Sequence, residues 1–263
     1  MKRNHVQETP READAAALRI AAVGDVHLGP DAAGRLRPAL QRIGEHADVL
    51  LLAGDLTCRG TVAEAEVVAA EFAGLGVPVL AVLGNHDHHS DAADDVIDVL
   101  GQRGIPVLEG QAQVLDIRGT RLAVAGAKGF GGGFAGRSGS AFGEREMKAF
   151  IEHTEESAAR LRAALEAASG ADVLVALTHY APVPATLRGE PLEIYPFLGS
   201  YQLAEAIDAA GADLAVHGHA HAGTEQGMTP AGVEVRNVAQ PVIGSPYVVY
   251  RMRSRRLGPA TVG

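Results

Sequence analysis

Short apolar runs alternate with amphipathic segments through the first half of the chain. Three runs have the length and β-branched content of buried strands, and each is followed directly by a glycine: Leu18–Val23, Asp48–Ala53 and Val77–Leu83. Between them, Leu36–His46 and Val62–Gly74 carry apolar residues at helical spacing. The alternation predicts the strand–helix–strand units of an α/β sheet.

The pattern changes after a predicted helix at Asp91–Leu100. Two short strands joined by Arg118-Gly119-Thr120 are typical of a hairpin, and the glycine-rich segment 129–143 predicts a loop. One long helix is expected at Glu144–Ala168 and a shorter one at Tyr201–Ala210. The remaining expected strands are Gln113–Ile117, Arg121–Ala125, Val173–Leu177, Leu214–Val216, Val233–Val238 and Tyr247–Met252.

Composition and chain organisation are those of a globular protein. Apolar residues make up 47% and charged residues 21% of the 263 positions. Because no linker of distinct composition divides the chain, we expect one domain over residues 17–253. The polar segment 1–16 is expected to be a flexible N-terminal tail, and residues 254–263 a C-terminal tail.

Charge and cysteine content exclude several classes of function. The net charge of −9 makes nucleic acid an unfavourable partner, because phosphate contacts usually need a basic surplus. A single cysteine, Cys58, excludes an intrachain disulfide and a cysteine-rich zinc site. The apolar runs are far shorter than the roughly 18 residues that span a bilayer, and no apolar signal core follows the N-terminus. We therefore expect a cytoplasmic protein without a membrane partner.

Residues typical of metal ligands follow five of the predicted strands. They comprise two carboxylates, one amide and four imidazoles: Asp25, His27, Asp55, Asn85, His179, His219 and His221. In open α/β sheets, ligands bind beyond the carboxyl ends of the strands. The mixed donors suit divalent Mn, Fe, Zn or Co rather than a calcium or thiolate site. Seven ligands are too many for one tetrahedral zinc, but fit two ions if a carboxylate bridges them.

In this order, the motifs resemble the signature of the calcineurin-like metallophosphoesterases. They are Asp25-Val26-His27, Gly54-Asp55, Gly84-Asn85-His86-Asp87, His179 and Gly218-His219-Ala220-His221. The resemblance implies a four-layer αββα sandwich, in which helices flank two mixed β-sheets and a binuclear site lies at the strand ends. The Gly-Asn-His-Asp form and the chain length are most similar to the bacterial branch related to cyclic-nucleotide phosphodiesterases.

The resemblance also implies a role for each ligand. Asp25, His27 and His221 would bind the first metal ion, and Asp55 would bridge the two ions. The second ion would be bound by the side chains of Asn85, His179 and His219. Two divalent ions per chain are therefore the expected cofactors.

The expected reaction is hydrolysis of a phosphate ester by in-line attack of a metal-bridging hydroxide. His86 is expected to be catalytic, stabilising the pentavalent phosphorus or protonating the leaving oxygen, with Asp87 orienting it. The alternative for His86 is a supporting hydrogen bond without kinetic effect. Tyr180 and Arg188, which follow His179 in the chain, are the expected substrate-binding residues.

The charges nearest the motifs favour a phosphodiester, because a monoester dianion usually needs additional Arg or Lys donors. The motif segments contain none, although Arg59, Lys128 and Arg137 would reverse this argument if their loops fold inward. The alternatives are a phosphomonoesterase or protein phosphatase using the same site, and a non-catalytic scaffold. The expected partner is a small organic phosphate or phosphodiester.

Overall fold

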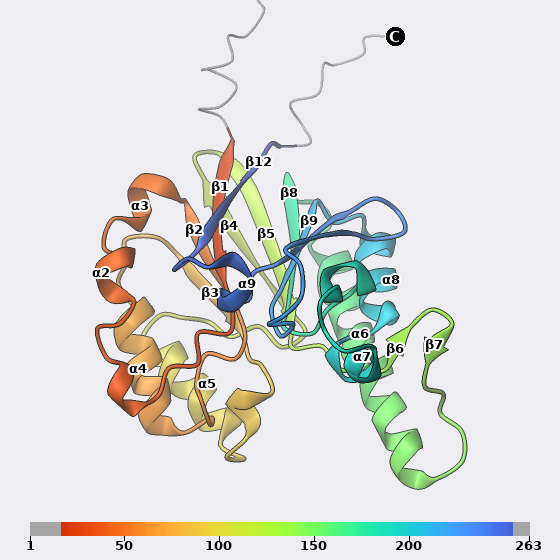
Figure 1. The fold of residues 1–263 in the computed structure, drawn as a ribbon. Coiled ribbons are helices and arrows are strands. Elements are labelled where there is room, and N and C mark those ends of the chain that lie inside the picture. Colours follow the sequence, from red (N-terminus) through yellow and green to blue (C-terminus); the bar gives the residue numbers. More distant parts are fainter. Residues whose placement is uncertain (1–16, 255–263) are drawn as a thin grey trace, which may run out of the picture.

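Two β-sheets pack face to face between two layers of helices in residues 17–254, the part of the chain that the computed structural model describes (Figure 1). The expected tails, 1–16 and 254–263 apart from Ser254, lie outside the described residues. The four layers confirm the predicted fold class.

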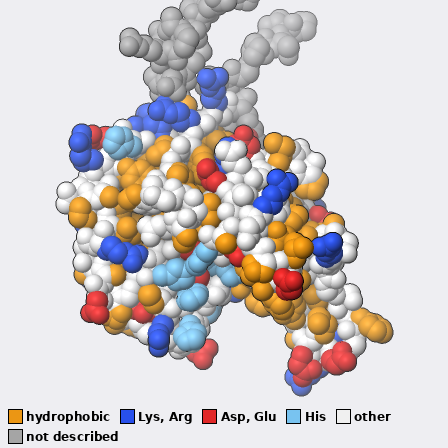
Figure 2. Space-filling view, in the orientation of Figure 1, with side chains coloured by type: hydrophobic (Ala, Val, Ile, Leu, Met, Phe, Trp, Pro, Cys, Tyr) orange, Lys and Arg blue, Asp and Glu red, His pale blue; other side chains and the backbone are white. Residues whose placement is uncertain are grey.

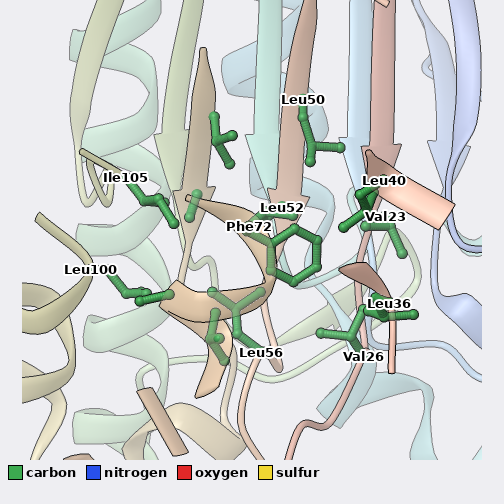
Figure 3. Close-up of a cluster of buried hydrophobic side chains, with 14 of the residues drawn as sticks. Val23, Val26, Leu36, Leu40, Leu50, Leu52, Leu56, Phe72, Leu100 and Ile105 are labelled. Carbon is green, nitrogen blue, oxygen red and sulfur yellow. The ribbon is translucent and has the colours of Figure 1, made fainter. Parts of the chain in front are cut away.

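The first sheet has the strand order β12-β1-β2-β3. Its strands are β1 (Leu18–Val23), β2 (Val49–Ala53), β3 (Val79–Val82) and β12 (Val248–Met252), the last antiparallel to β1. Four helices contribute to the layer beside it: α2 (Arg37–Leu40), α3 (Ile43–His46), α4 (Val62–Phe72) and α5 (Ala93–Gln102). Successive residues of β1 alternate between the two faces, so Val23 contacts the helices whereas Ile20 and Ala22 face the second sheet. Figure 3 shows the core on the helix side, where the fully buried Phe72 packs among leucines and valines.

The second sheet has the order β10-β11-β9-β8-β5-β4. Its strands are β4 (Gln111–Ile117), β5 (Thr120–Ala127), β8 (Val173–Thr178), β9 (Leu214–His217), β10 (Gln226–Met228) and β11 (Glu234–Asn237). Two helices, α6 (Arg145–Ala167) and α8 (Tyr201–Ala210), pack against its outer face through Leu161, Leu165 and Leu203. The two sheets pack against each other through buried valines and leucines. Val124, Val175 and Leu177 are examples, and each is fully removed from solvent.

The predicted hairpin and the long helix are confirmed, but one predicted helix is wrong. Leu36–His46 forms two short helices because Arg42 leaves helical geometry (φ −107°, ψ 18°). The three-residue strand β10 went unpredicted because it has only one partly buried position, Gly227. Within residues 17–254, no helix is both long and apolar enough to cross a membrane.

The glycine-rich segment contains a two-stranded hairpin, β6 (Gly133–Phe134) and β7 (Arg137–Ser138). It projects beyond the sheets together with the N-terminal half of α6 (Figure 1). The amide of Gly132 donates to the Pro196 carbonyl in helix α7 (Tyr195–Leu198), and that of Gly133 donates to the Gly199 carbonyl directly after it, which ties the segment to the chain after His179. The remaining short helices are Pro30–Ala32, His86–His88, Pro184–Leu187, Leu192–Ile194 and α9 (Gln240–Ile243).

Candidate metal centre

The structure brings the predicted ligands together where β1, β2, β3, β8 and β9 end. Two groups have donor atoms within 4.8 Å of one another: Asp25, His27, Asp55 and His221 form the first, and Asp55, His179 and His219 form the second. Asp55 belongs to both groups. Figure 2 shows the histidine side chains gathered at the centre of this face.

In the first group, two imidazoles and two carboxylates converge. The Nε2 atoms of His27 and His221 lie 3.5 Å apart. The same His221 atom is 2.9 Å from Oδ1 of Asp25, and His27 Nε2 is 3.7 Å from Oδ2 of Asp55. Ring nitrogens and carboxylate oxygens that face a common point form a donor set for a divalent cation.

The second group has its histidine tautomers set by backbone carbonyls. His179 donates from Nδ1 to the carbonyl of Ala53 at 2.9 Å, so its Nε2 faces Asp55 Oδ1 at 3.4 Å and Asn85 Oδ1 at 3.1 Å. His219 donates from Nε2 to the carbonyl of Phe197 at 3.2 Å, which leaves Nδ1 as its ligand atom. A ligating histidine usually donates its other N–H in this way.

Burial keeps the imidazoles of the second group in the neutral form that binds a metal, whereas the buried carboxylates lack a Lys or Arg partner within the described chain. Asp25 and Asp55 are 3% and 1% exposed, and neither forms an ion pair with a Lys or Arg side chain of residues 17–254. Burial raises the pKa of Asp25 to about 6, opposed by its hydrogen bond with His221. Burial also lowers the pKa of His219 to about 3 and holds that of His179 well below its usual value. Neutral imidazoles beside buried carboxylates fit a divalent cation.

The ligands lie on unusual backbone. Six non-glycine residues of the described chain have positive φ, and four are candidate ligands: Asp25 (55°), His27 (41°), Asp55 (49°) and His219 (71°). Such conformations are uncommon for non-glycine residues and cluster at functional sites. They turn each side chain out of its strand direction and toward the shared centre.

Three glycines next to the ligands allow ligand side chains from other loops to lie close to the backbone. A methyl group at Gly84 would overlap the Asp55 carboxylate, and one at Gly218 would overlap the Asp25 carboxylate. At Gly54 it would lie 2.6 Å from the His179 ring. Of these three glycines, only Gly54 has a positive φ (79°). At the other two, glycine is required by space instead.

His86 lies beside the ligands, as expected of a catalytic residue. Its side chain is 45% exposed, and its Nε2 is 4.0 Å from Asp55 Oδ2. Its Nδ1 lies 2.9 Å from the carbonyl of Cys58, to which it donates, and its ring packs edge-on against His27. The imidazole therefore presents Nε2 to the site and to solvent.

Asp87 does not make the expected contact with His86. It is fully buried, and its carboxylate accepts from the amides of Leu56, Thr57 and Gly84 and from the Thr57 hydroxyl. The Cys58 carbonyl holds the His86 ring, so an orienting role of Asp87 would act through the loop, and it stays a prediction. Asp87 instead joins the loops that follow β2 and β3.

The two predicted substrate residues differ in position. The Tyr180 ring is 4.4 Å from the His219 ring. Arg188 is exposed and forms no hydrogen bond or ion pair with a candidate ligand among residues 17–254, so its role stays a prediction.

Lys128 lies near the candidate site, a position that the sequence analysis had left open. Its ammonium lies 5.5 Å from the centre of the Tyr180 ring, and its carbonyl accepts from the amides of His179 and Tyr180. The sequence does offer a clue to this position. Lys128 directly follows β5, which pairs in parallel with β8, the strand that precedes His179.

Comparisons with known proteins agree with this geometry. The family model described as calcineurin-like phosphoesterase matches residues 18–223. No curated protein matches the chain.

Several solved structures share the fold at low sequence identity. Phosphopantetheinyl hydrolase (PptH) from Mycobacterium tuberculosis is 16% identical, with a TM-score of 0.63 over 94% of this chain and 99% of that one. TT1561 of Thermus thermophilus is 18% identical, with a TM-score of 0.52 over 84% and 88%. GAP50, the anchor in the inner membrane complex of Plasmodium, is 14% identical, with a TM-score of 0.54 over 86% and 72%. At these identities the likeness concerns the fold alone.

Proposed function

Because the chain belongs to the calcineurin-like phosphoesterase family and is therefore a metal-dependent phosphoester hydrolase, we propose that it hydrolyses a small organic phosphodiester at the strand-end site. The observation that carries the site assignment is the position of Asp55, whose carboxylate belongs to both ligand groups. A carboxylate shared in this way can serve two ions held close together.

Each of the seven ligands has a proposed role. Asp25, His27 and His221 would hold one ion, Asn85, His179 and His219 would hold the other, and Asp55 would contribute to both. When bound, two divalent cations supply positive charge for the phosphoryl oxygens and activate water for in-line attack. The protein holds the donors in place through the glycines at close approach and through carbonyls that set the imidazole tautomers.

We assign the proton chemistry to His86. Its Nδ1–H is held by the Cys58 carbonyl, and its exposed Nε2 faces the space where an ester would bind. A protonated Nε2 donates to the leaving oxygen as the bond to phosphorus breaks. Asp87 acts as a positioning residue, because it fixes the loop that carries His86 relative to the loop after β2.

The diester preference is supported by the ring-lined side of the site, where Tyr180 and Phe130 adjoin the second ligand group. A second organic substituent would find apolar contact there. The likeness to the branch related to cyclic-nucleotide phosphodiesterases makes a cyclic nucleotide the first diester to test.

Phosphomonoester hydrolysis is the second candidate, and the position of Lys128 favours it. The sequence argument for a diester required Lys128 to lie outside the site, but its ammonium lies over the Phe130 and Tyr180 rings. An additional cation suits the dianion of a monoester.

The discriminating experiment is a substrate screen of the protein loaded with Mn, Fe, Zn or Co. The substrates are bis-para-nitrophenyl phosphate, para-nitrophenyl phosphate, and 2′,3′- and 3′,5′-cyclic nucleotides. A tenfold higher kcat/KM for diesters supports the first proposal, and a tenfold preference for the monoester overturns it in favour of the second. Hydrolysis of none of them with any metal would contradict both.

A further inference from the structure

Lys128 is a half-buried cation whose ammonium lies over aromatic rings. It is 5.1 Å from the centre of the Phe130 ring and 5.5 Å from that of Tyr180. The ammonium forms no hydrogen bond or ion pair with the side chains described in residues 17–254, and the nearby Glu109 carboxylate pairs with Arg160 instead. The Lys128 carbonyl accepts from the amides of His179 and Tyr180, which places the residue beside the second ligand group.

A cation in this position calls for an anion. Removing an ammonium from water is costly unless it is paired or hydrogen-bonded. Two divalent ions at the ligand groups would add further positive charge nearby, so the cost rises when the centre is loaded. An anionic oxygen of a bound substrate is the group that would offset it.

A continuous aromatic wall leads away from the same point. We define this aromatic wall as Tyr180, Phe130, Phe150 and Phe197. Tyr180 is 4.4 Å from the ligand His219, and successive ring centres along the wall are 5.7, 5.0 and 6.3 Å apart. The wall therefore connects a candidate metal ligand to the projecting end of α6.

The wall ends at an apolar groove. The groove has a volume of about 300 Å³ and is lined by Gly132, Gly139, Glu146, Met147, Phe150, Pro196 and Phe197. Phe197 is 59% exposed. Figure 2 shows hydrophobic surface next to the histidines, on the side of α6 and α7. A concave apolar surface next to convergent polar groups is typical of a small-molecule site.

We propose that Lys128 and the aromatic wall form the substrate subsite of this enzyme. The Lys128 ammonium donates to a phosphoryl oxygen, and an aromatic or extended apolar organic group of the ester lies along the wall with its end in the groove at Phe197. The proposal rests on the proposed hydrolysis at the metal centre, and it names the substrate class as phosphate esters with a bulky apolar group. Continuity from His219 to Phe197 and the charge of Lys128 both favour this occupant.

The test compares two esters with the same leaving group. Para-nitrophenyl phenylphosphonate and para-nitrophenyl methylphosphonate differ only in the substituent that would contact the wall. Because intrinsic reactivity cancels between variants, the informative quantity is the phenyl-to-methyl ratio of kcat/KM. We expect Phe197→Ala and Phe150→Ala to lower this ratio by about tenfold, which is what loss of an aromatic contact allows. The Phe197 carbonyl that holds His219 remains in the variant.

Matched controls separate the wall from general apolar exposure. Met228→Ala removes a side chain that is 58% exposed and outside the groove, so the ratio should not change. For the cation, Lys128→Met should raise KM for both esters by about tenfold, and Lys128→Arg should restore it to within about threefold. Lys148→Met, an exposed lysine on α6, should change neither value.

A binding measurement tests the subsite independently of catalysis. Calorimetry on the metal-loaded protein compares the Kd of phenylphosphonate and methylphosphonate, neither of which is hydrolysed. Weaker phenylphosphonate binding by Phe197→Ala, with little change for methylphosphonate, supports the subsite. An unchanged ratio in both arms, or an unchanged KM in Lys128→Met, overturns it. Failure to hydrolyse either ester contradicts the proposed function, while the binding arm still reports on the wall.

Discussion

The two sides of the candidate metal centre are built differently. On the side of the first ligand group, the histidine rings reach solvent: the side chains of His221 and of the neighbouring His86 are 44% and 45% exposed. On the side of the second ligand group, His179 is 0% exposed, its ring packs against those of Tyr180 and His219, and its amide donates to the Lys128 carbonyl. The first side offers open, polar groups suited to a reacting phosphate and its leaving group. The second offers apolar surface and one cation, which are suited to choosing which ester binds.

This difference also separates what mutations should do. Changes at the ligands and at His86 should alter metal content and turnover with every substrate. Changes along the aromatic wall should alter which substrate is preferred. Four predictions test this division, from the largest expected effect to the smallest.

Loss of Asp55 should have the largest effect, because it removes the residue shared by both ligand groups. We expect Asp55→Ala to lose both ions. The loss in kcat/KM should exceed about 10–100-fold, which is typical for removal of a residue that only supports a ligand. His27→Ala is the matched comparison, since it belongs to one group and should release one ion. Elemental analysis after dialysis measures both. Retention of two ions and normal turnover in Asp55→Ala would show that the two groups are not joined there.

His86→Ala should lower kcat on the order of 10²–10⁴-fold while metal content stays unchanged. The loss should shrink for esters with good leaving groups such as para-nitrophenolate, which hardly need a proton. The measurement is kcat across a series of leaving-group pKa values, with elemental analysis as the control. An equal loss across the series would assign His86 to stabilising charge on phosphorus instead.

Gly218→Ala should weaken metal binding by about 10–100-fold, comparable to the loss of a residue that orients a ligand. The added methyl group would overlap the Asp25 carboxylate and must displace it. Gly101→Ala is the control, because no atom lies within 4 Å of a methyl group there. Titration of each apoprotein with Mn²⁺ compares the two Kd values. Equal Kd values would mean that Asp25 does not need its observed position.

Tyr180→Phe should have the smallest effect, a change of less than about threefold in kcat/KM. Burial raises the pKa of the Tyr180 hydroxyl to about 12, so the group stays protonated and cannot serve as a base near neutral pH. Tyr180→Ala should lower kcat/KM further, because it removes the ring that packs on His219. If Tyr180→Phe were as impaired as Tyr180→Ala, the hydroxyl rather than the ring would carry the role.

The same two sides explain which parts of the site were predictable from the sequence. The ligands come directly after predicted strands, so their positions at the strand ends placed Asp25, Asp55 and His179 at one edge of the fold. The wall has no such signal: Phe130 lies in a glycine-rich segment, and Phe150 looked like an ordinary position on a long helix. Only tertiary packing between α6, α7 and the second sheet brings these rings beside His219.

Smaller errors have the same origin. The expected contact between Asp87 and His86 followed from adjacency in the chain, but the folded loop directs the carboxylate to backbone amides instead. Similarly, a strand-end glycine in a sequence indicates a turn, whereas Gly84 is needed because Asp55 comes close in space. Local patterns predicted the elements and the ligand set, but could not predict contacts made between distant segments.

The most direct test of the account is a crystal structure of the protein reconstituted with Mn²⁺, with anomalous scattering used to locate the ions. The account predicts two ions roughly 3.5–4 Å apart. One carboxylate, that of Asp55, should bind both, and elemental analysis of the same preparation should give two ions per chain. A single ion in a fully active preparation, or two ions that share no contact with Asp55, would contradict the central claim.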